Sequence, residues 1–331
     1  MELQLLSSPL ADLDPARWDA FVTASPQGSL YTLHGYLLAL REDWEAWIVT
    51  DGDTWLGIMP LAVTRRWRYQ AALQPMFTQY IGPVLAPDLP GRVVKSQAQA
   101  RQVTALLAGR LAVLDLVVQQ LPPGYQQVLP FYWAGFTLHT RYTMVLDLGA
   151  EDLFQQLAEP LRRQVNKARR GQLRMVPGSD THQLESLMLA SIRAGRDVTG
   201  GPGEAAFPVM RRLAAWLRAS GRGGVYEVTN PEGDCLAAGI FAQYQGKSLY
   251  LAGAWHPDGQ STGAMSYLLW EAICQARQAG ATVFDFEGSM IEGVASFFAR
   301  YGAVPVPYVQ IQRNSLPLAI RFFQWIRGLR S

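Results

Sequence analysis

Asp285 and Glu287 are two carboxylates whose spacing could place them on one substrate. Strand side chains alternate between faces, so a run that buries Phe284 and Phe286 presents both acids on the opposite face. An amine that attacks an acyl carbonyl must lose a proton, and a carboxylate shielded by aromatic rings can have its pKa raised for that task. We therefore predict Glu287 as a general base with Asp285 as its orienting neighbour. The alternative is that both acids pair with an arginine such as Arg300 or cap the next helix.

The elements around these acids are a strand and a short helix. Gly288 predicts the end of the strand, residues 294–301 are typical of a helix, and Gly302 predicts where that helix stops. We assign contacts with an acceptor to Ser289, after the strand, and to Tyr250, on a neighbouring strand.

A second candidate site lies where a strand, a glycine-bearing turn and a helix follow one another over residues 252–270. The first amides of a helix lack partners and its dipole favours an anion, so the turn could bind the pyrophosphate of a donor. The predicted donor-binding residues are Gln260, Ser261, Thr262, Gly263 and Ala264. The alternative is an ordinary turn that Ser261 or Thr262 caps.

A third candidate is a cationic helix face. Leu161, Val165 and Ala168 follow helical spacing and predict a buried side. The exposed side then carries a ridge that could bind phosphates of a nucleotide-linked donor or RNA, or could simply be solvated. We call Arg163, Lys167 and Arg170 the cationic ridge.

Composition limits the class of protein. The chain has 331 residues, of which 49% are apolar and 17% charged, and a chain of this length predicts two domains of about 150 residues each. No apolar run approaches the roughly 20 residues that span a bilayer, and the first residues lack a basic leader, so we expect a cytoplasmic protein. Two cysteines and four scattered histidines predict neither a disulfide framework nor a metal site.

Each half of the chain shows the same order of helices, hairpin strands and a helix that crosses to another strand. This order predicts an α/β fold with mixed, mostly antiparallel sheets flanked by helices, divided into domains at 1–148 and 149–331. A helix over 153–168 should carry the cationic ridge. The aromatic and basic tail, 318–330, predicts a last helix that packs back on the protein, for example on the N-terminal domain, or lies on an anionic membrane surface.

With these residues in view, the second half resembles the FemABX family, peptidoglycan aminoacyltransferases built from two GNAT-like domains, and the wider GNAT acyltransferase superfamily. The resemblance covers about 142–308 and rests on four segments, 142–148, 161–171, 236–238 and 284–303. The turn at Gln260 and Gly263 resembles the acyl-CoA loop of GNAT enzymes, although Met265 stands where that loop has a small residue.

The resemblance implies a bacterial N-acyltransferase, such as an N-acetyltransferase, that uses acyl-CoA as co-substrate, holds no tightly bound cofactor and acts on a small-molecule or peptide amine. Its alternatives are transfer from aminoacyl-tRNA to a peptidoglycan precursor, or a degenerate, non-catalytic module; DNA is not an expected partner. One departure concerns a lysine on the last short helix of tRNA-using members, which is thought to steady the oxyanion. Here Phe297 and Phe298 occupy that place, and the nearest cation is Arg300.

Overall fold

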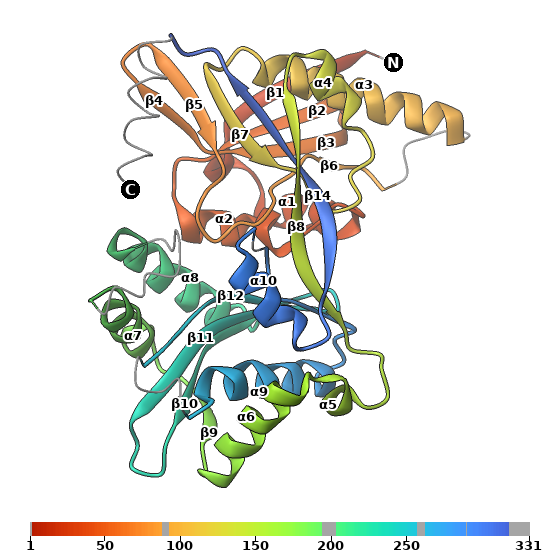
Figure 1. Ribbon diagram of the computed structural model, residues 1–331. Coiled ribbons are helices and arrows are strands. Elements are labelled where there is room, and N and C mark those ends of the chain that lie inside the picture. Colours follow the sequence, from red (N-terminus) through yellow and green to blue (C-terminus); the bar gives the residue numbers. More distant parts are fainter. Residues whose placement is uncertain (1, 88–92, 194–202, 257–261, 289, 318–331) are drawn as a thin grey trace. The chain divides into compact units, whose positions relative to one another are not determined.

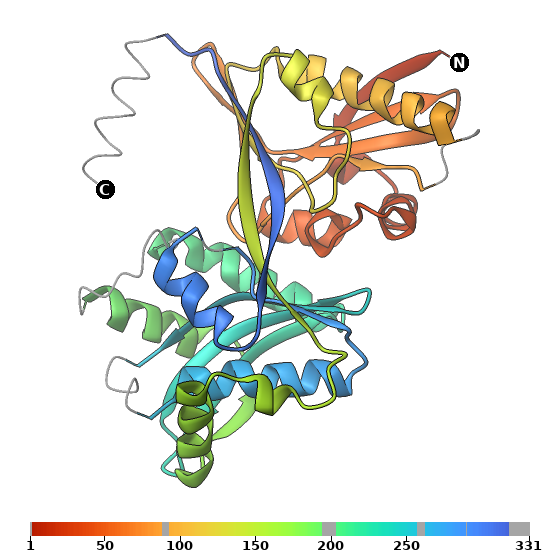
Figure 2. The ribbon, with the colours of Figure 1, turned by 45° about the vertical axis from the view of Figure 1, so that its right-hand side comes forward.

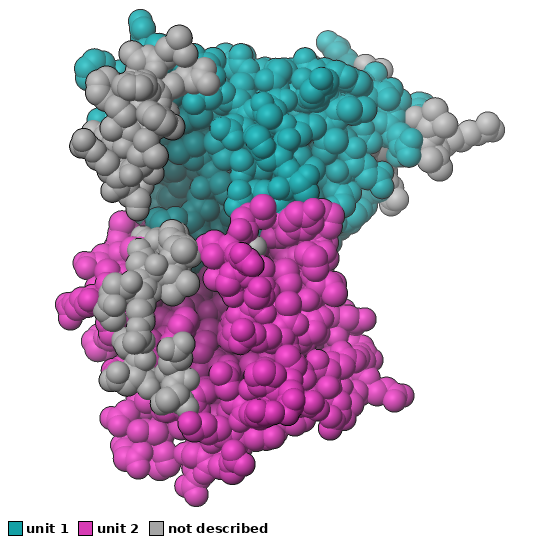
Figure 3. Space-filling view, viewed as in Figure 1, with its two compact units in different colours: residues 1–141, 308–331 teal, residues 142–307 magenta. Residues whose placement is uncertain are grey.

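The computed structural model describes residues 2–87, 93–193, 203–256, 262–288 and 290–317. The predicted sites at Gln260, Ser261 and Ser289 and the predicted tail helix lie outside these ranges. The chain forms two compact units (Figure 3). Unit 1 holds the chain up to Arg141 and the segment that begins at Tyr308, and unit 2 is Tyr142–Pro307. No helix in the described ranges is both long and apolar enough to cross a membrane.

The division therefore differs from the boundary expected at 148. It falls inside two strands, β8 (Thr137–Asp147) and β14 (Val304–Asn314), each of which contributes residues to both units. A change in composition marks a linker, but a continuous strand that serves two units leaves no such mark. The chain also returns to unit 1 after unit 2, which the linear order of elements did not predict.

Unit 1 contains two sheets. Strands β1, β2, β3 and β6 form an antiparallel sheet, and the second sheet has the order β4, β5, β7 and β14, with β5 and β7 parallel. Helix α3 packs on the first sheet through a core that includes Val103 and Leu107. The elements, labelled in Figure 1, are β1 (Leu3–Pro9), α1 (Pro15–Ala24), α2 (His34–Leu40), β2 (Glu45–Asp51), β3 (Thr54–Leu61), β4 (Val63–Arg66), β5 (Tyr69–Leu73), β6 (Val84–Leu85), α3 (Val93–Leu111), β7 (Leu116–Gln120) and α4 (Leu129–Trp133), with short 3-10 turns at Leu10–Asp12 and Leu30–Thr32.

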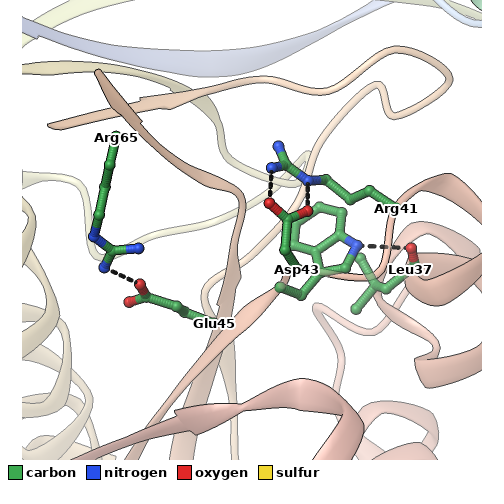
Figure 4. A network of polar contacts seen from close by, with 6 residues as sticks. Leu37, Arg41, Asp43, Glu45 and Arg65 are labelled. Atoms are coloured by element: carbon green, nitrogen blue, oxygen red, sulfur yellow. Dashed lines mark hydrogen bonds and ion pairs between the residues drawn. The ribbon is translucent and has the colours of Figure 1, made fainter. Parts of the chain in front are cut away.

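A polar network fastens the start of β2 to its neighbours in unit 1 (Figure 4). The guanidinium of Arg41 donates two hydrogen bonds of 2.5 Å to Asp43 and thereby lowers the pKa of that carboxyl. The indole of Trp44 donates to the backbone of α2 at 2.7 Å, and Arg65 pairs with Glu45. These contacts fix the turn that leads from α2 into the sheet.

Unit 2 contains one sheet with the order β8, β13, β12, β11, β10 and β9, in which only β12 and β13 are parallel. Helices α9 and α6 lie side by side on one face of it, and α7 and α8 cover the other (Figures 1 and 2). The elements are α5 (Leu153–Gln156), α6 (Glu159–Arg170), β9 (Arg174–Pro177), α7 (His182–Arg193), α8 (Phe207–Ala219), β10 (Gly223–Thr229), β11 (Cys235–Tyr244), β12 (Lys247–Trp255), α9 (Ala264–Gln278), β13 (Val283–Asp285) and α10 (Glu292–Ala299), with a 3-10 turn at Glu204–Ala206.

The helix expected over 153–168 is instead two helices, α5 and α6. The chain is extended at Leu157 and Ala158 between them, and Pro160 occupies the first turn of α6. A proline lacks the amide hydrogen that a continuous helix would use, and its ring clashes with the carbonyl four residues earlier, so Pro160 fits only in the first turn of a new helix. The predicted buried side of α6 is confirmed, since Leu161, Val165 and Ala168 are at most 1% exposed.

Candidate active site

A cavity of about 420 Å³ lies within unit 2. Its described walls come from β12, from the start of α9, from α6 and from α10. The lining side chains are largely apolar or aromatic, and no carboxylate is among them. The lining residues are Gln164, Tyr250, Gly253, Trp255, Gly263, Ala264, Met265, Ser266, Ile291, Gly293, Val294, Phe297, Phe298 and Arg300.

One wall of the cavity is the part of β12 that extends beyond its pairing with β13. These parallel strands pair only over residues 247–249 and 283–285, because β13 ends at Asp285 while β12 continues to Trp255. The pairing of β12 with β11 also shifts, since Phe241 faces Tyr250 whereas Ile240 faces Ala252. Leu251 is therefore an extra residue, and such a bulge disrupts the ladder and bends the strand. The part of β12 beyond the paired residues supplies one wall of the cavity.

The start of α9 forms the second wall. Gly263 has a φ of +76°, and a Cβ there would lie 2.7 Å from the backbone oxygen of Gln164. Glycine is thus needed for close packing of α6 on α9, whatever binds at the turn. The hydroxyl of Thr262 accepts a 3.3 Å hydrogen bond from the Ala264 amide, but the N-cap residue of α9 is Gly263, and no described side chain caps the helix. The cavity is lined there by three residues of the first turn of α9, Ala264, Met265 and Ser266.

The strand that carries the two carboxylates is shorter than predicted. Phe284 and Phe286 are buried as expected, but β13 ends at Asp285 and Glu287 has a positive φ of 62°. The reason is local, because the Glu287 amide donates a 2.9 Å hydrogen bond to the Asp285 carboxylate and turns the chain. Strict alternation therefore stops before Glu287, and the expectation that the strand runs on to place both acids on one strand face was wrong.

Asp285 has a position suited to holding the turn. It is 4% exposed, and its carboxylate also accepts a hydrogen bond from the hydroxyl of Thr143 on β8. Burial raises the pKa of Asp285, while the bonds from Thr143 and the Glu287 amide and the charge of Lys247 oppose that rise. Neither Asp285 nor Glu287 lines the cavity.

Tyr250 connects Glu287 to the cavity. Tyr250 is partly buried, and loss of hydration followed by the negative charge of Glu287 raises the pKa of its phenol above the ordinary value, so the phenol stays protonated at neutral pH. The ring packs edge-on against Phe298 with 6.2 Å between centroids. Its hydroxyl lies over Gly253, where a Cβ would be 2.3 Å away. Tyr250, predicted to contact an acceptor, is thus a cavity residue with an acid beside it.

Helix α10 supplies the third wall. Phe298 stacks on Phe286 with 4.8 Å between ring centroids, and Phe297 lies beside it at 5.8 Å. Arg300 is the one charged residue among the described lining, and no ion pair between Arg300 and either Asp285 or Glu287 occurs among the described residues. The described residues also include no cluster of side chains that could hold a metal ion.

The cationic ridge lies on the exposed side of α6, opposite the buried residues. Arg163 pairs with Glu159 one turn earlier, while Lys167 and Arg170 are exposed. Gln164, which sequence reasoning missed, lines the cavity and accepts a 2.6 Å hydrogen bond from Ser266 of α9. Its only sequence signal is its place beside the buried Val165, and such a place does not specify a partner.

Residues 155–295 match the family model described as acetyltransferase (GNAT) domain. Comparison of the sequence with curated proteins gave no match.

Solved structures show the same arrangement over nearly the whole chain. Crystal structures of FemX are similar with a TM-score of 0.68 at 15% identity, covering 93% of this chain and 97% of that one. A tandem GNAT protein from the clavulanic acid biosynthesis pathway has a TM-score of 0.58 at 12% identity, covering 96% and 99%. L-PGS from Bacillus licheniformis has a TM-score of 0.57 at 15% identity, covering 95% and 96%.

Residues 155–295 therefore match a GNAT acetyltransferase domain, and the chain as a whole shares its fold with FemX and with a tandem GNAT protein. The predicted resemblance and the mixed α/β fold class are confirmed. At these identities the solved structures establish the fold, and the donor and acceptor are subjects for proposal.

Proposed function

We propose that the chain transfers an acyl group from an acyl-CoA to a small-molecule or peptide amine by direct attack. The observation that carries this proposal is the cavity of unit 2, which extends from the first turn of α9 along β12 to the aromatic residues of α10. The first-turn amides and Thr262, Gly263 and Ala264 would bind the phosphates of the donor, as the N-terminus of a helix suits an anion.

The residues around Tyr250 would then handle protons. The amine nitrogen attacks the thioester carbonyl, the carbon–sulfur bond breaks, and the amine proton passes to Glu287, directly or through water. The protonated phenol of Tyr250 donates its proton to the leaving thiolate and regains one from the protonated Glu287, so the amine proton ends on the CoA thiol. Asp285 holds the turn that positions Glu287. Backbone amides at the Leu251 bulge are the donors we assign to the developing oxyanion, in place of the lysine that Phe298 cannot supply. No covalent enzyme intermediate forms.

The test is release of CoA thiol from acyl-CoA in the presence of a panel of amines. Val294→Trp places a large ring into the cavity from α10, and Ser296→Trp adds the same ring at an exposed position of that helix outside the lining. We expect amine-dependent thiol release by the wild type and by Ser296→Trp, and its loss in Val294→Trp. Equal release by both variants, or none by the wild type with any amine, contradicts the proposal. Binding without release would instead support the non-catalytic module.

The cationic ridge supports a second candidate, transfer from aminoacyl-tRNA to a peptidoglycan precursor. Arg163, Lys167 and Arg170 share one exposed face of α6, and Gln164 of the same helix lines the cavity. The affinity of a protein that binds RNA through such contacts falls as the salt concentration rises. For single strands, a plot of the logarithm of affinity against the logarithm of salt concentration falls with a slope of about 0.7 per neutralised phosphate.

This candidate is tested by tRNA binding at increasing salt. Neutralising the cationic ridge to glutamine should lower both the affinity and the salt slope. The control neutralises three exposed cations of unit 1, Arg66, Lys95 and Arg101. Absent or salt-insensitive tRNA binding leaves acyl-CoA as the donor.

A further inference from the structure

The wall of the cavity that α10 and the start of α9 form is apolar. Phe298 is 5% exposed and held between Phe286 and Tyr250, and Met265 is 9% exposed within the same core. Val294 completes this wall. These side chains cannot withdraw from the cavity without breaking the core of unit 2, so a ligand must match their surface.

The chemistry of this wall disfavours a charged acyl group. A cationic group would lose its hydration without gaining a carboxylate, since the described lining contains none. The one described cation of the lining, Arg300, is exposed. A carboxylate on the acyl group would have to leave the apolar wall to reach it.

The size of the cavity favours more than an acetyl group. Its volume of about 420 Å³ falls in the range of roughly 300–1,000 Å³ that small-molecule pockets have. An acetyl group occupies on the order of two water volumes, or about 60 Å³, and would touch little of the apolar wall. Gly293 of α10 also lines the cavity at an exposed position, and a Cβ there would meet nothing within 4 Å, so the space beside it at the exposed side of the cavity is open.

We propose that the transferred acyl group is an uncharged, apolar chain longer than acetyl, which lies against Met265, Val294, Phe297 and Phe298, and that the space beside Gly293 sets its length. This inference rests on the proposed acyl-CoA donor. Each methylene that is fully buried should raise affinity about fourfold until the space is filled.

The experiment is calorimetric titration of the full chain with CoA and with acetyl-, butanoyl-, hexanoyl- and octanoyl-CoA. We expect affinity to rise along the series and then to level off. Succinyl-CoA, which has the length of butanoyl-CoA with an added carboxylate, should bind more weakly than butanoyl-CoA. Affinity that is flat along the series, or succinyl-CoA binding tighter than butanoyl-CoA, overturns the inference.

Gly293→Leu tests the length limit, because the new side chain enters open space. This variant should keep the wild-type affinity for CoA itself, but its affinity should no longer increase from hexanoyl-CoA to octanoyl-CoA. Ser296→Leu, on the exposed side of α10, should bind the whole series as the wild type does. The same chain-length profile in both variants contradicts the assignment of Gly293. Failure of the wild type to bind CoA or any acyl-CoA contradicts the proposed function, and binding that ignores chain length contradicts the length inference alone.

Discussion

At the scale of single residues, the proposed chemistry depends on the pair formed by Tyr250 and Glu287. Tyr250 lines the cavity, and Glu287 lies close enough to raise the pKa of its phenol. Glu287 itself does not line the cavity, so Tyr250 and Glu287 make different contacts with a substrate. The roles of the two residues can therefore be separated by substitution.

Glu287→Gln should lower kcat by about 10²- to 10⁴-fold, which is the usual contribution of general acid–base catalysis. Glu292→Gln is the matched control, because Glu292 is an exposed acid of α10 outside the cavity lining. The measurement is kcat for amine-dependent thiol release at saturating donor. Full turnover by Glu287→Gln would show that another group takes the proton.

Asp285 should act on stability and on the position of Glu287. Asp285→Ala leaves the buried Thr143 hydroxyl and the Glu287 amide without their acceptor and should lower the free energy of unfolding by about 1–3 kcal/mol. Asp285→Asn retains an acceptor and should lose less. Denaturant unfolding measures both, and equal losses would contradict the acceptor role.

The same residue predicts a pH dependence. Burial raises the pKa of Asp285 in the folded state, so its protonated form favours folding. Its contribution to stability is present below the unfolded pKa of about 3.9 and is lost as pH rises through the higher folded pKa. As pH rises through this range, the free energy of unfolding of the wild type should therefore fall relative to that of Asp285→Asn. Denaturant unfolding at several pH values measures this difference.

At the scale of elements, the two ends of α9 offer a matched pair of glycines. Gly263 and Gly280 both have positive φ, of 76° and 83°, but only at Gly263 would a Cβ approach a neighbouring backbone. Gly280→Ala should cost about 1–2 kcal/mol from the left-handed backbone alone. Gly263→Ala should cost clearly more, since α6 must also shift, and equal losses in the free energy of unfolding would contradict the packing role.

Helices α7 and α8 are joined by Glu185 and Arg211. Glu185 is 6% exposed and accepts two hydrogen bonds from Arg211 and one from Thr181. Glu185→Gln should lower the free energy of unfolding by about 1–3 kcal/mol. The bond from Arg211, opposed by burial, lowers the pKa of Glu185, so this stabilisation is present above the unfolded pKa of about 4.3 and is lost as pH falls through the folded value. If the wild type were more stable than Glu185→Gln by the same free energy at pH 3 as at neutral pH, the stabilising role of the Glu185–Arg211 pair would be contradicted.

The same elements show what the sequence could predict. The buried side of α6 followed from Leu161, Val165 and Ala168, because helical periodicity is a local property. The end of β13 could not be predicted in this way, since Asp285 is held by Thr143, 142 residues earlier. The cavity itself depends on the Leu251 bulge against β11 and on Gln164 bonding Ser266, 102 residues later. Contacts of this range leave no periodic signal.

At the scale of the whole molecule, the tandem GNAT architecture was predictable from the order of elements and from the motifs of the second half. The division between the units was not, because β8 and β14 each contribute to both. The candidate chemistry lies in unit 2, which also holds the whole segment that matches the GNAT family model. The identity of the acyl donor therefore decides which of the proposed functions the chain has.

The most direct measurement is the melting temperature of the full chain with hexanoyl-CoA, compared with aminoacyl-tRNA at equal concentration. A ligand that binds only the native state stabilises it by mass action, about 2.7 kcal/mol at a hundredfold excess over its Kd. The account predicts a rise in melting temperature with hexanoyl-CoA for the wild type and for Ser296→Trp, and none for Val294→Trp. No rise with any acyl-CoA, together with a rise on addition of aminoacyl-tRNA, would contradict it.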